Sequence, residues 1–157
     1  ITGITTGKIV DFGVKDSMNM GACMAPAAGN VIVQNLIDNG RKPEWYDKII
    51  TGDLGLVGKD ILLDITRSKG YDIADRYMDC GIEIYSREQE IQAGGSGCGC
   101  SASMLAGYIV KMLEKGTWQR VLFVPTGALL SPVSFNEGDS VPGIAHAVVF
   151  ERSGESQ

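Results

Sequence analysis

The sequence predicts an α/β domain with a mainly parallel sheet whose last strand runs antiparallel to its neighbour. Short apolar segments with strand character alternate with segments of helical spacing, which is typical of strand–helix–strand units. The last two strand-like segments, at 120–126 and 143–151, have no helix between them, so they are expected to pair antiparallel. A length of 157 residues suits one globular domain.

Two strand–helix pairs are expected before residue 70. The predicted elements are a strand at 5–14, a helix that has Pro26 in its first turn and continues over 27–39, a short buried strand at 48–51 and a helix that begins at Leu56. Pro26 suits the first turn of the first helix, because that position needs no backbone N–H. Gly40 and Gly70 follow the two helices as stop signals, and the turn 52–55 joins the second strand to its helix.

The second half of the chain is expected to start with an irregular stretch. Residues 71–102 show only possible strand character around 81–85, and a helix is predicted at 101–113. The segment 120–126 is a continuous apolar run, which favours a central strand. Between it and the last strand lies a loop long enough to suggest a functional role.

The helix predicted at 101–113 is apolar around its whole circumference, with Lys111 as its one charged residue. Such a helix must be buried on all sides, but a single sheet covers only one of them. We therefore expect this chain to form one half of a larger layered fold.

Composition and charge exclude several classes of function. The chain carries 14 Lys and Arg against 19 Asp and Glu, a net charge of −5 without basic clusters, so nucleic acid is not an expected partner. No apolar stretch is long enough to span a bilayer and the N-terminus does not resemble a signal peptide, so a soluble chain without a transmembrane segment is expected. Four cysteines are too few for a disulfide scaffold, and we expect free thiols.

Five segments together resemble a known family. They are TTGKIVDFGVKDSMNMGACMAPAA at 5–28, TGDLGLVGKD at 51–60, AGGSGCGCSA at 93–102, RVLFVPTGALLS at 120–131 and SFNEGDSVPGIAH at 134–146. In combination they resemble the C-terminal half of thiolase-fold proteins and, within that superfamily, the stage V sporulation AD family of spore-forming bacteria. The resemblance covers nearly the whole chain.

The resemblance implies that residues 1–157 form a C-terminal thiolase-like domain, with a five-stranded mixed sheet and helices on both faces. The N-terminal half of the same protein would be its first partner. The resemblance further implies binding of dipicolinic acid or its calcium chelate, and uptake into the developing spore with membrane proteins of the same operon. It places the protein at the cytoplasmic face of the spore inner membrane, as a peripheral homo-oligomer without a cofactor.

The resemblance also bears on catalysis. In condensing enzymes of this superfamily the first half supplies a nucleophilic cysteine, and the second half supplies a His and a His or Asn. The corresponding stretches here are Gly-Asp-Leu-Gly at 52–55 and Gly-Cys-Gly-Cys at 97–100. We therefore expect no catalytic residues, and the alternatives are an acyltransferase with displaced catalytic groups or a structural assembly subunit.

Cys98, Gly99 and Cys100 are the first candidate ligand-binding residues. Two thiolates this close could share a metal ion, but a structural zinc site needs about four ligands at paired spacings, so no metal site is predicted. In the alternative interpretation, the small residues let the following helix present its N-terminal N–H groups to a carboxylate ligand.

Asp53, Asn136 and His146 are the other candidate ligand-binding residues. Asp53 follows a strand, where a parallel sheet opens its binding crevice, but Asp in a Gly-x-x-Gly turn also has a structural role. Asn136 lies in the long loop, where polar side chains are often only solvated. His146, the one histidine, could hydrogen-bond a carboxylate or be a histidine of the core or sheet edge.

Overall fold

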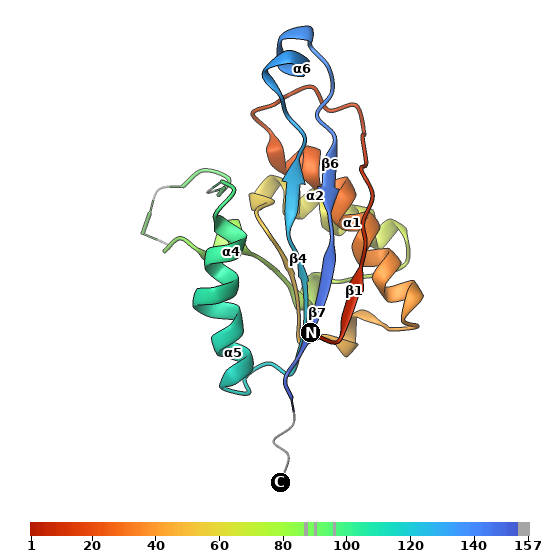
Figure 1. The fold of residues 1–157 in the computed structure, drawn as a ribbon, viewed down its shortest axis with the longest axis vertical. Coiled ribbons are helices and arrows are strands. Elements are labelled where there is room, and N and C mark those ends of the chain that lie inside the picture. Colours follow the sequence, from red (N-terminus) through yellow and green to blue (C-terminus); the bar gives the residue numbers. More distant parts are fainter. Residues whose placement is uncertain (87, 90, 96, 154–157) are drawn as a thin grey trace.

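The structure is a computed structural model of the chain, and it describes residues 1–86, 88–89, 91–95 and 97–153. Its centre is a five-stranded sheet in the order β1-β7-β4-β2-β3 (Figure 1). The strands are β1 (Gly3–Thr5), β2 (Lys48–Thr51), β3 (Tyr77–Asp79), β4 (Arg120–Val124) and β7 (Ala147–Glu151). Strands β3, β2 and β4 run parallel, and β7 is antiparallel to both β4 and β1. The predicted mixed sheet with an antiparallel last strand is confirmed.

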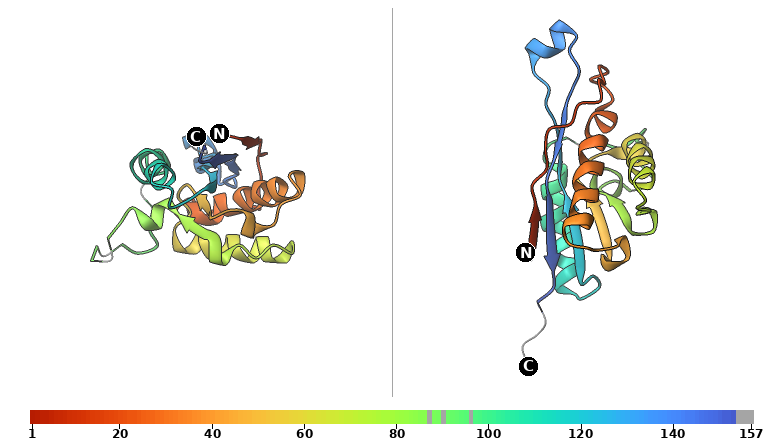
Figure 2. Two further views of the ribbon diagram at one scale, coloured as in Figure 1. Left: turned by 90° about the horizontal axis from the view of Figure 1, so that it is seen from below. Right: turned by 90° about the vertical axis from the view of Figure 1, so that its right-hand side faces the viewer.

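Helices cover both faces of the sheet, as the resemblance implied (Figure 2). Helices α1 (Met20–Asp38) and α2 (Gly55–Ser68) pack on one face. The other face carries one continuous helical stretch, made of α4 (Cys100–Met104), the π-helical turn η3 (Leu105–Ile109) and α5 (Val110–Glu114). The central strands therefore contribute side chains to two separate cores.

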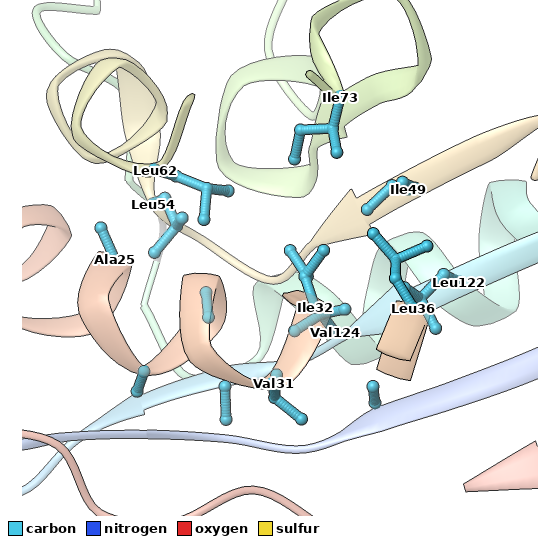
Figure 3. Packing of buried hydrophobic residues seen from close by; sticks show 14 of the residues in the cluster. Ala25, Val31, Ile32, Leu36, Ile49, Leu54, Leu62, Ile73, Leu122 and Val124 are labelled. Atoms are coloured by element: carbon cyan, nitrogen blue, oxygen red, sulfur yellow. The ribbon is translucent and has the colours of Figure 1, made fainter. Parts of the chain in front are cut away.

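The larger core lies between the sheet and the α1–α2 layer (Figure 3). Ile32 and Leu36 of α1, Leu62 of α2, Ile49 of β2 and Leu122 of β4 converge there, and each is at most 1% exposed. Burial of one such side chain stabilises a fold by roughly 1.5–3 kcal/mol. The smaller core on the other face contains Ile50, Val121 and Phe123, the alternate residues of the same strands.

Among the described residues, α1 is the one helix whose length and apolar composition, taken by themselves, would allow it to cross a membrane. Within this chain 61% of its most apolar stretch is buried. The buried residues include Ala25, Ala28, Val31 and Ile32, which pack in the larger core. In this fold α1 therefore acts as the central helix of a core.

The start of α1 differs from the prediction, which placed Pro26 in its first turn. The helix begins at Met20, and Asn19 caps it by accepting a hydrogen bond from the backbone N–H of Ala22 at 3.2 Å. Pro26 is therefore inside the helix and not in its first turn. The predicted stop is correct, because Gly40 takes a positive φ of 59° directly after Asn39, the residue that caps the C-terminus of α1.

The first strand is much shorter than the predicted segment 5–14, of which only Thr5 belongs to β1. Two glycines interrupt the ladder. Gly7 packs against the carbonyl of Ala145 with no room for a Cβ, and Gly13 has a positive φ of 76°. Beyond β1, an isolated bridge joins Val10 to Gly143 of strand β6 (Gly143–Ala145), which lies outside the five-stranded sheet.

The stretch at 71–86 contains more regular structure than predicted. It holds the short helix η2 (Ala74–Arg76), strand β3, and the single helical turn α3 (Cys80–Glu83). The strand character expected around 81–85 is wrong, because the chain leaves the sheet at Asp79 and turns at once into α3. A further short helix, η1 (Pro43–Trp45), precedes β2.

The predicted long loop after β4 is a projecting hairpin. Strands β5 (Thr126–Ala128) and β6 (Gly143–Ala145) pair antiparallel, and the short helix α6 (Pro132–Glu137) forms the tip at the top of Figure 1. The predicted strand at 143–151 is consequently divided into β6 and β7 at His146.

The helical stretch α4–α5 is buried on one side only within this chain. Met104, Ile109 and Leu113 pack against the sheet, whereas Ala106 and Tyr108 are exposed. Ala102, Ser103 and Gly107 are exposed as well, and these exposed positions of α4–α5 are called its exposed flank. Burial on all sides, which the apolar sequence predicts, is therefore not achieved by the described residues of this chain alone.

Helices α1 and α2 approach each other closely at two glycines. A Cβ on Gly58 would lie 2.8 Å from the Cα of Gly21 and 2.9 Å from the Cβ of Leu54. A Cβ on Gly21 would collide with the carbonyl oxygen of Leu54. These glycines therefore bring the start of α1 against the turn that precedes α2.

This contact gives a test of the fold. In an open helix, replacing Gly by Ala stabilises by about 1 kcal/mol, but Gly58→Ala should destabilise because of the steric overlap with α1. We expect a net loss of about 1–3 kcal/mol, measured by chemical denaturation. Asp60→Ala, at an exposed position of the same helix, is the control and should change stability little. A Gly58→Ala variant as stable as the parent would contradict the helix contact.

Candidate functional site

A pocket of about 550 Å³ lies where β2 and β4 end and where α1 and α2 begin. Its walls come from residues 18–21 and Met24 at the start of α1, from Asp53, Leu54 and Val57 at the start of α2, and from residues 126–128 of β5. The glycine-rich segment before α4, defined here by Ala93–Gly95 and Gly97–Cys98, closes another side. This volume is typical of small-molecule sites, and the carboxyl ends of parallel strands are where such sites form.

Asp53 connects two walls of the pocket. Its Oδ2 atom accepts a hydrogen bond from the backbone N–H of Gly97 at 3.0 Å. Close by, the N–H of Leu56 donates to the carbonyl of Ala93 at 2.6 Å. Gly55 has a φ of 64°, and a Cβ there would collide with the same carbonyl. The turn 52–55 and the glycine-rich segment are therefore held together, so Asp53 has a structural role and also lines the pocket.

Directly behind this turn lies Asp79, a carboxylate that is 1% exposed at the end of β3. Its Oδ2 accepts hydrogen bonds from the Thr51 hydroxyl at 2.6 Å and from the Leu54 N–H at 2.8 Å. Its Oδ1 accepts one from the Gly55 N–H at 3.0 Å. Because Thr51 gives its one proton to Asp79, the Tyr77 hydroxyl must donate to Thr51, at 2.7 Å. These contacts link β3, β2 and the start of α2.

Burial raises the pKa of the Asp79 carboxyl above its usual value, because a buried carboxylate loses its hydration. The three hydrogen bonds from Thr51, Leu54 and Gly55 lower the pKa in opposition, and the nearby charge of Asp53 raises it further. Burial likewise raises the pKa of the Tyr77 hydroxyl, with the charge of Asp79 adding to the effect. The Tyr77 hydroxyl therefore acts as a hydrogen-bond donor in this network.

Asp79 and Thr51 were not predicted from the sequence as residues of the site. Their hydrogen bond joins residues 28 positions apart in the sequence, and β3 was not predicted as a strand. One signal was present: Tyr77-Met78-Asp79 ends in an acidic residue before a glycine-containing turn, as Ile50 to Asp53 does. An Asp at the end of β3 and another two residues after the end of the neighbouring parallel strand β2 would have indicated a shared site.

The cysteine motif is divided between two environments. Cys98 is exposed and lines the pocket, and Gly99 is exposed outside it. Cys100 is buried in the smaller core together with Cys80. Across the part of the chain that the structure describes, no three His, Cys, Asp or Glu side chains gather in an arrangement that could hold a metal ion.

Asn136 and His146 do not line the pocket. Asn136 lies on α6 at the tip of the hairpin and is exposed. His146 is exposed between β6 and β7, and its Nδ1 atom accepts a hydrogen bond from the N–H of Gly7 at 3.1 Å. The structure thus brings Asp53 and Cys98 together in the pocket and leaves these two residues elsewhere.

The remaining lining of the pocket is largely apolar. Met18, Met20 and Met24 contribute flexible thioether side chains, which adapt to irregular ligand shapes. The pocket's described lining includes no Lys, Arg or His. Thr126 supplies a hydroxyl whose oxygen is buried and has no hydrogen-bond partner among the described residues. A ligand with polar groups could satisfy this hydroxyl.

Comparisons with known proteins give a consistent result. The family model for stage V sporulation protein AD matches residues 1–151. A curated relative, stage V sporulation protein AD of Bacillus subtilis (strain 168), is 47% identical over 154 residues. The alignment covers 98% of this chain and 46% of that relative, so the chain spans less than half of the relative's length.

The four thiols should differ strongly in reactivity. Cys98 is exposed, whereas Cys23, Cys80 and Cys100 are buried. Burial raises the pKa of the Cys80 thiol to about 12, with the charge of Asp79 adding to the effect, so almost no reactive thiolate forms at neutral pH. Iodoacetamide should therefore modify Cys98 first, and the other three only after unfolding, as followed by peptide mass spectrometry. Equal labelling of Cys98 and Cys80 in the folded protein would contradict the described site.

Proposed function

The chain belongs to the family of stage V sporulation protein AD, a family of sporulation proteins, and from that membership we propose that it contributes a binding site for dipicolinic acid or its calcium chelate. The site is the pocket between the starts of α1 and α2, and no reaction is catalysed there. The observation that carries this proposal is a pocket of about 550 Å³ whose described lining combines apolar side chains with backbone N–H groups and a buried hydroxyl.

The shape and chemistry of the pocket suit a flat aromatic ligand with two carboxylates. Met24, Leu54 and Val57 offer an apolar surface for the ring. The first N–H groups of any α-helix lack a partner within the helix, and Met20 and Gly21, the first two residues of α1, line the pocket. Because the described lining has no basic side chain, the ligand's charge must be offset by N–H donors, by calcium, or by the rest of the protein.

The absence of catalysis is proposed from the residues at the pocket. The turn that would carry a histidine in condensing enzymes carries Asp53, whose Oδ2 accepts the N–H of Gly97. His146, the only histidine in the sequence, lies outside the pocket and accepts the N–H of Gly7. Cys98 thus has no histidine among the described pocket residues to activate its thiol.

The remaining half of the protein is proposed to cover the exposed flank of α4–α5. The chain spans 46% of its curated relative, so more than half of that protein's length lies outside it. On this flank Ala102, Ala106 and Gly107 have small or no side chains, which would let a second layer approach the helix closely. Such coverage would complete the burial that the apolar sequence of this helix requires.

We place the assembled protein at the spore inner membrane, on its cytoplasmic face, as a peripheral homo-oligomer that contacts membrane proteins of the same operon. Exposed apolar side chains support contacts of this kind. Several of them lie on the projecting hairpin, namely Leu129, Leu130, Val133 and Phe135.

The ligand proposal is tested with the intact two-half protein. Isothermal titration calorimetry should show tighter binding of dipicolinic acid than of benzoate, which has one carboxylate. Val57→Trp should weaken binding of dipicolinic acid about tenfold, because the larger ring fills the pocket. Leu56→Trp is the matched control, since Leu56 is the neighbouring residue of α2, has a similar exposure and does not line the pocket.

Three results would contradict the proposal. Equal affinity for benzoate and dipicolinic acid would remove the ligand assignment. Turnover of a thioester by the intact protein would identify a condensing-type acyltransferase. No binding, together with a pocket packed shut in a crystal structure of the intact protein, would favour a structural assembly subunit.

The covering of α4–α5 has its own test. In the intact protein Ala106→Trp should lower the melting temperature by several degrees, because the flank has no room for an indole once a second layer covers it. Ala74→Trp, at an exposed position of η2, is the control. Equal melting temperatures for the two variants would argue that the flank stays open.

A further inference from the structure

We propose that Asp79 is a positioning residue of the pocket: its buried carboxylate fixes the turn 52–55 and, through Asp53, the glycine-rich segment that forms the facing wall. Asp79 itself does not line the pocket. Its effect on a ligand would therefore be indirect. The part of this inference that concerns ligand affinity rests on the proposed function, whereas the part that concerns the two walls does not.

The first step is the capping of α2. Leu54 occupies the N-cap position, and its side chain makes no capping hydrogen bond. Leu54 and Gly55 are buried. Their N–H groups therefore need an acceptor from outside the helix, because the first N–H groups of a helix have no partner within it. Asp79 supplies that acceptor from β3, with one oxygen to Leu54 and the other to Gly55. The capping group of α2 is thus held by a different strand of the sheet.

The second step is the release of Asp53 for another role. In many helices an acidic residue near the N-terminus binds the first N–H groups itself. Here Asp79 already accepts the N–H groups of Leu54 and Gly55, while the Oδ2 atom of Asp53 accepts the N–H of Gly97. The two carboxylates therefore share the polar contacts of the site: Asp79 holds the helix start and Asp53 holds the glycine-rich segment.

The third step is the close approach of these two carboxylates. Gly81, two residues after Asp79, lies between them. A Cβ at this position would collide with Oδ1 of Asp53 and lie 3.1 Å from Oδ1 of Asp79. The carbonyl of Gly81 also accepts the N–H of Gly95 at 3.3 Å. The end of β3 thus contacts both the turn and the glycine-rich segment, which gives Asp79 a short path to the pocket wall.

The test uses Asp79→Asn in the intact protein. Asparagine keeps the shape of the side chain and one acceptor oxygen, but it turns an NH₂ group toward a backbone N–H that needs an acceptor. Hydrogen–deuterium exchange, followed by mass spectrometry without ligand, should become faster in a peptide covering 52–58 and also in one covering 93–98. None of the three hydrogen bonds of Asp79 reaches the second peptide, so its faster exchange would report the coupling of the two walls.

General destabilisation is separated by a second variant. Val149→Ala removes buried volume from β7, outside the pocket, and serves as a destabilised control of similar melting temperature. It should leave the relative exchange of the 93–98 peptide unchanged. Equal acceleration of that peptide in both variants, or none in Asp79→Asn, would overturn the inference.

Should Asp79→Asn fail to fold, Thr51→Val decides the question. Valine has nearly the shape of threonine but cannot donate to Asp79, so the carboxylate loses one of its three hydrogen bonds. Faster exchange of the 93–98 peptide would support the inference, and unchanged exchange would overturn it.

Affinity for dipicolinic acid is the second readout, and Asp79→Asn is expected to weaken it about tenfold. If the parent protein does not bind dipicolinic acid, the proposed ligand fails, while the exchange experiment still decides the role of Asp79. If the parent binds and Asp79→Asn binds equally well, the positioning role fails and the ligand stands.

Discussion

The fold depends on the burial of its central strands on both faces. Ile49 and Ile50 are consecutive residues of β2 and both are fully buried, one in each core. The same holds for Leu122 and Val121 of β4. Two such strands require a helical layer on each side, and polar side chains can lie only at their ends. The pocket lies at those ends because the chain must turn there into a helix or a hairpin.

This constraint explains which elements the sequence predicted. Strand β2 was predicted with its bounds at 48–51, and the apolar run at 120–126 was recognised as the central strand, since two-sided burial leaves a continuous apolar pattern. Edge strands leave no such pattern. Strand β3 has three residues and ends in Asp79, and β1 pairs with one neighbour through three residues. Their positions are determined by partners distant in sequence, so local patterns did not reveal them.

The start of α1 was missed for a different reason. Glycine and proline usually indicate loops, and both occur in its first turns. Here Gly21 serves the close contact with α2, which is a tertiary requirement that sequence patterns do not express.

The residues of the candidate site were likewise predicted only where a local sequence pattern marks them. Asp53 and Cys98 were predicted from a turn and a short motif, whereas Asp79 and Thr126 gain their roles only through packing, and Asn136 and His146 lie outside the pocket.

The arrangement of polar groups supports the proposal that the pocket binds a ligand without catalysing a reaction. A general base must reach a proton of the substrate, but Asp79 is 1% exposed and accepts two backbone N–H groups and a hydroxyl. Asp53, the carboxylate that lines the pocket, accepts the N–H of Gly97 and so holds a wall. Under this proposal the acidic side chains hold the walls of the cavity, and recognition of the ligand rests with backbone groups, methionines and one hydroxyl. Such a lining can select a ligand by size and by hydrogen bonding without supplying a group that transfers its protons.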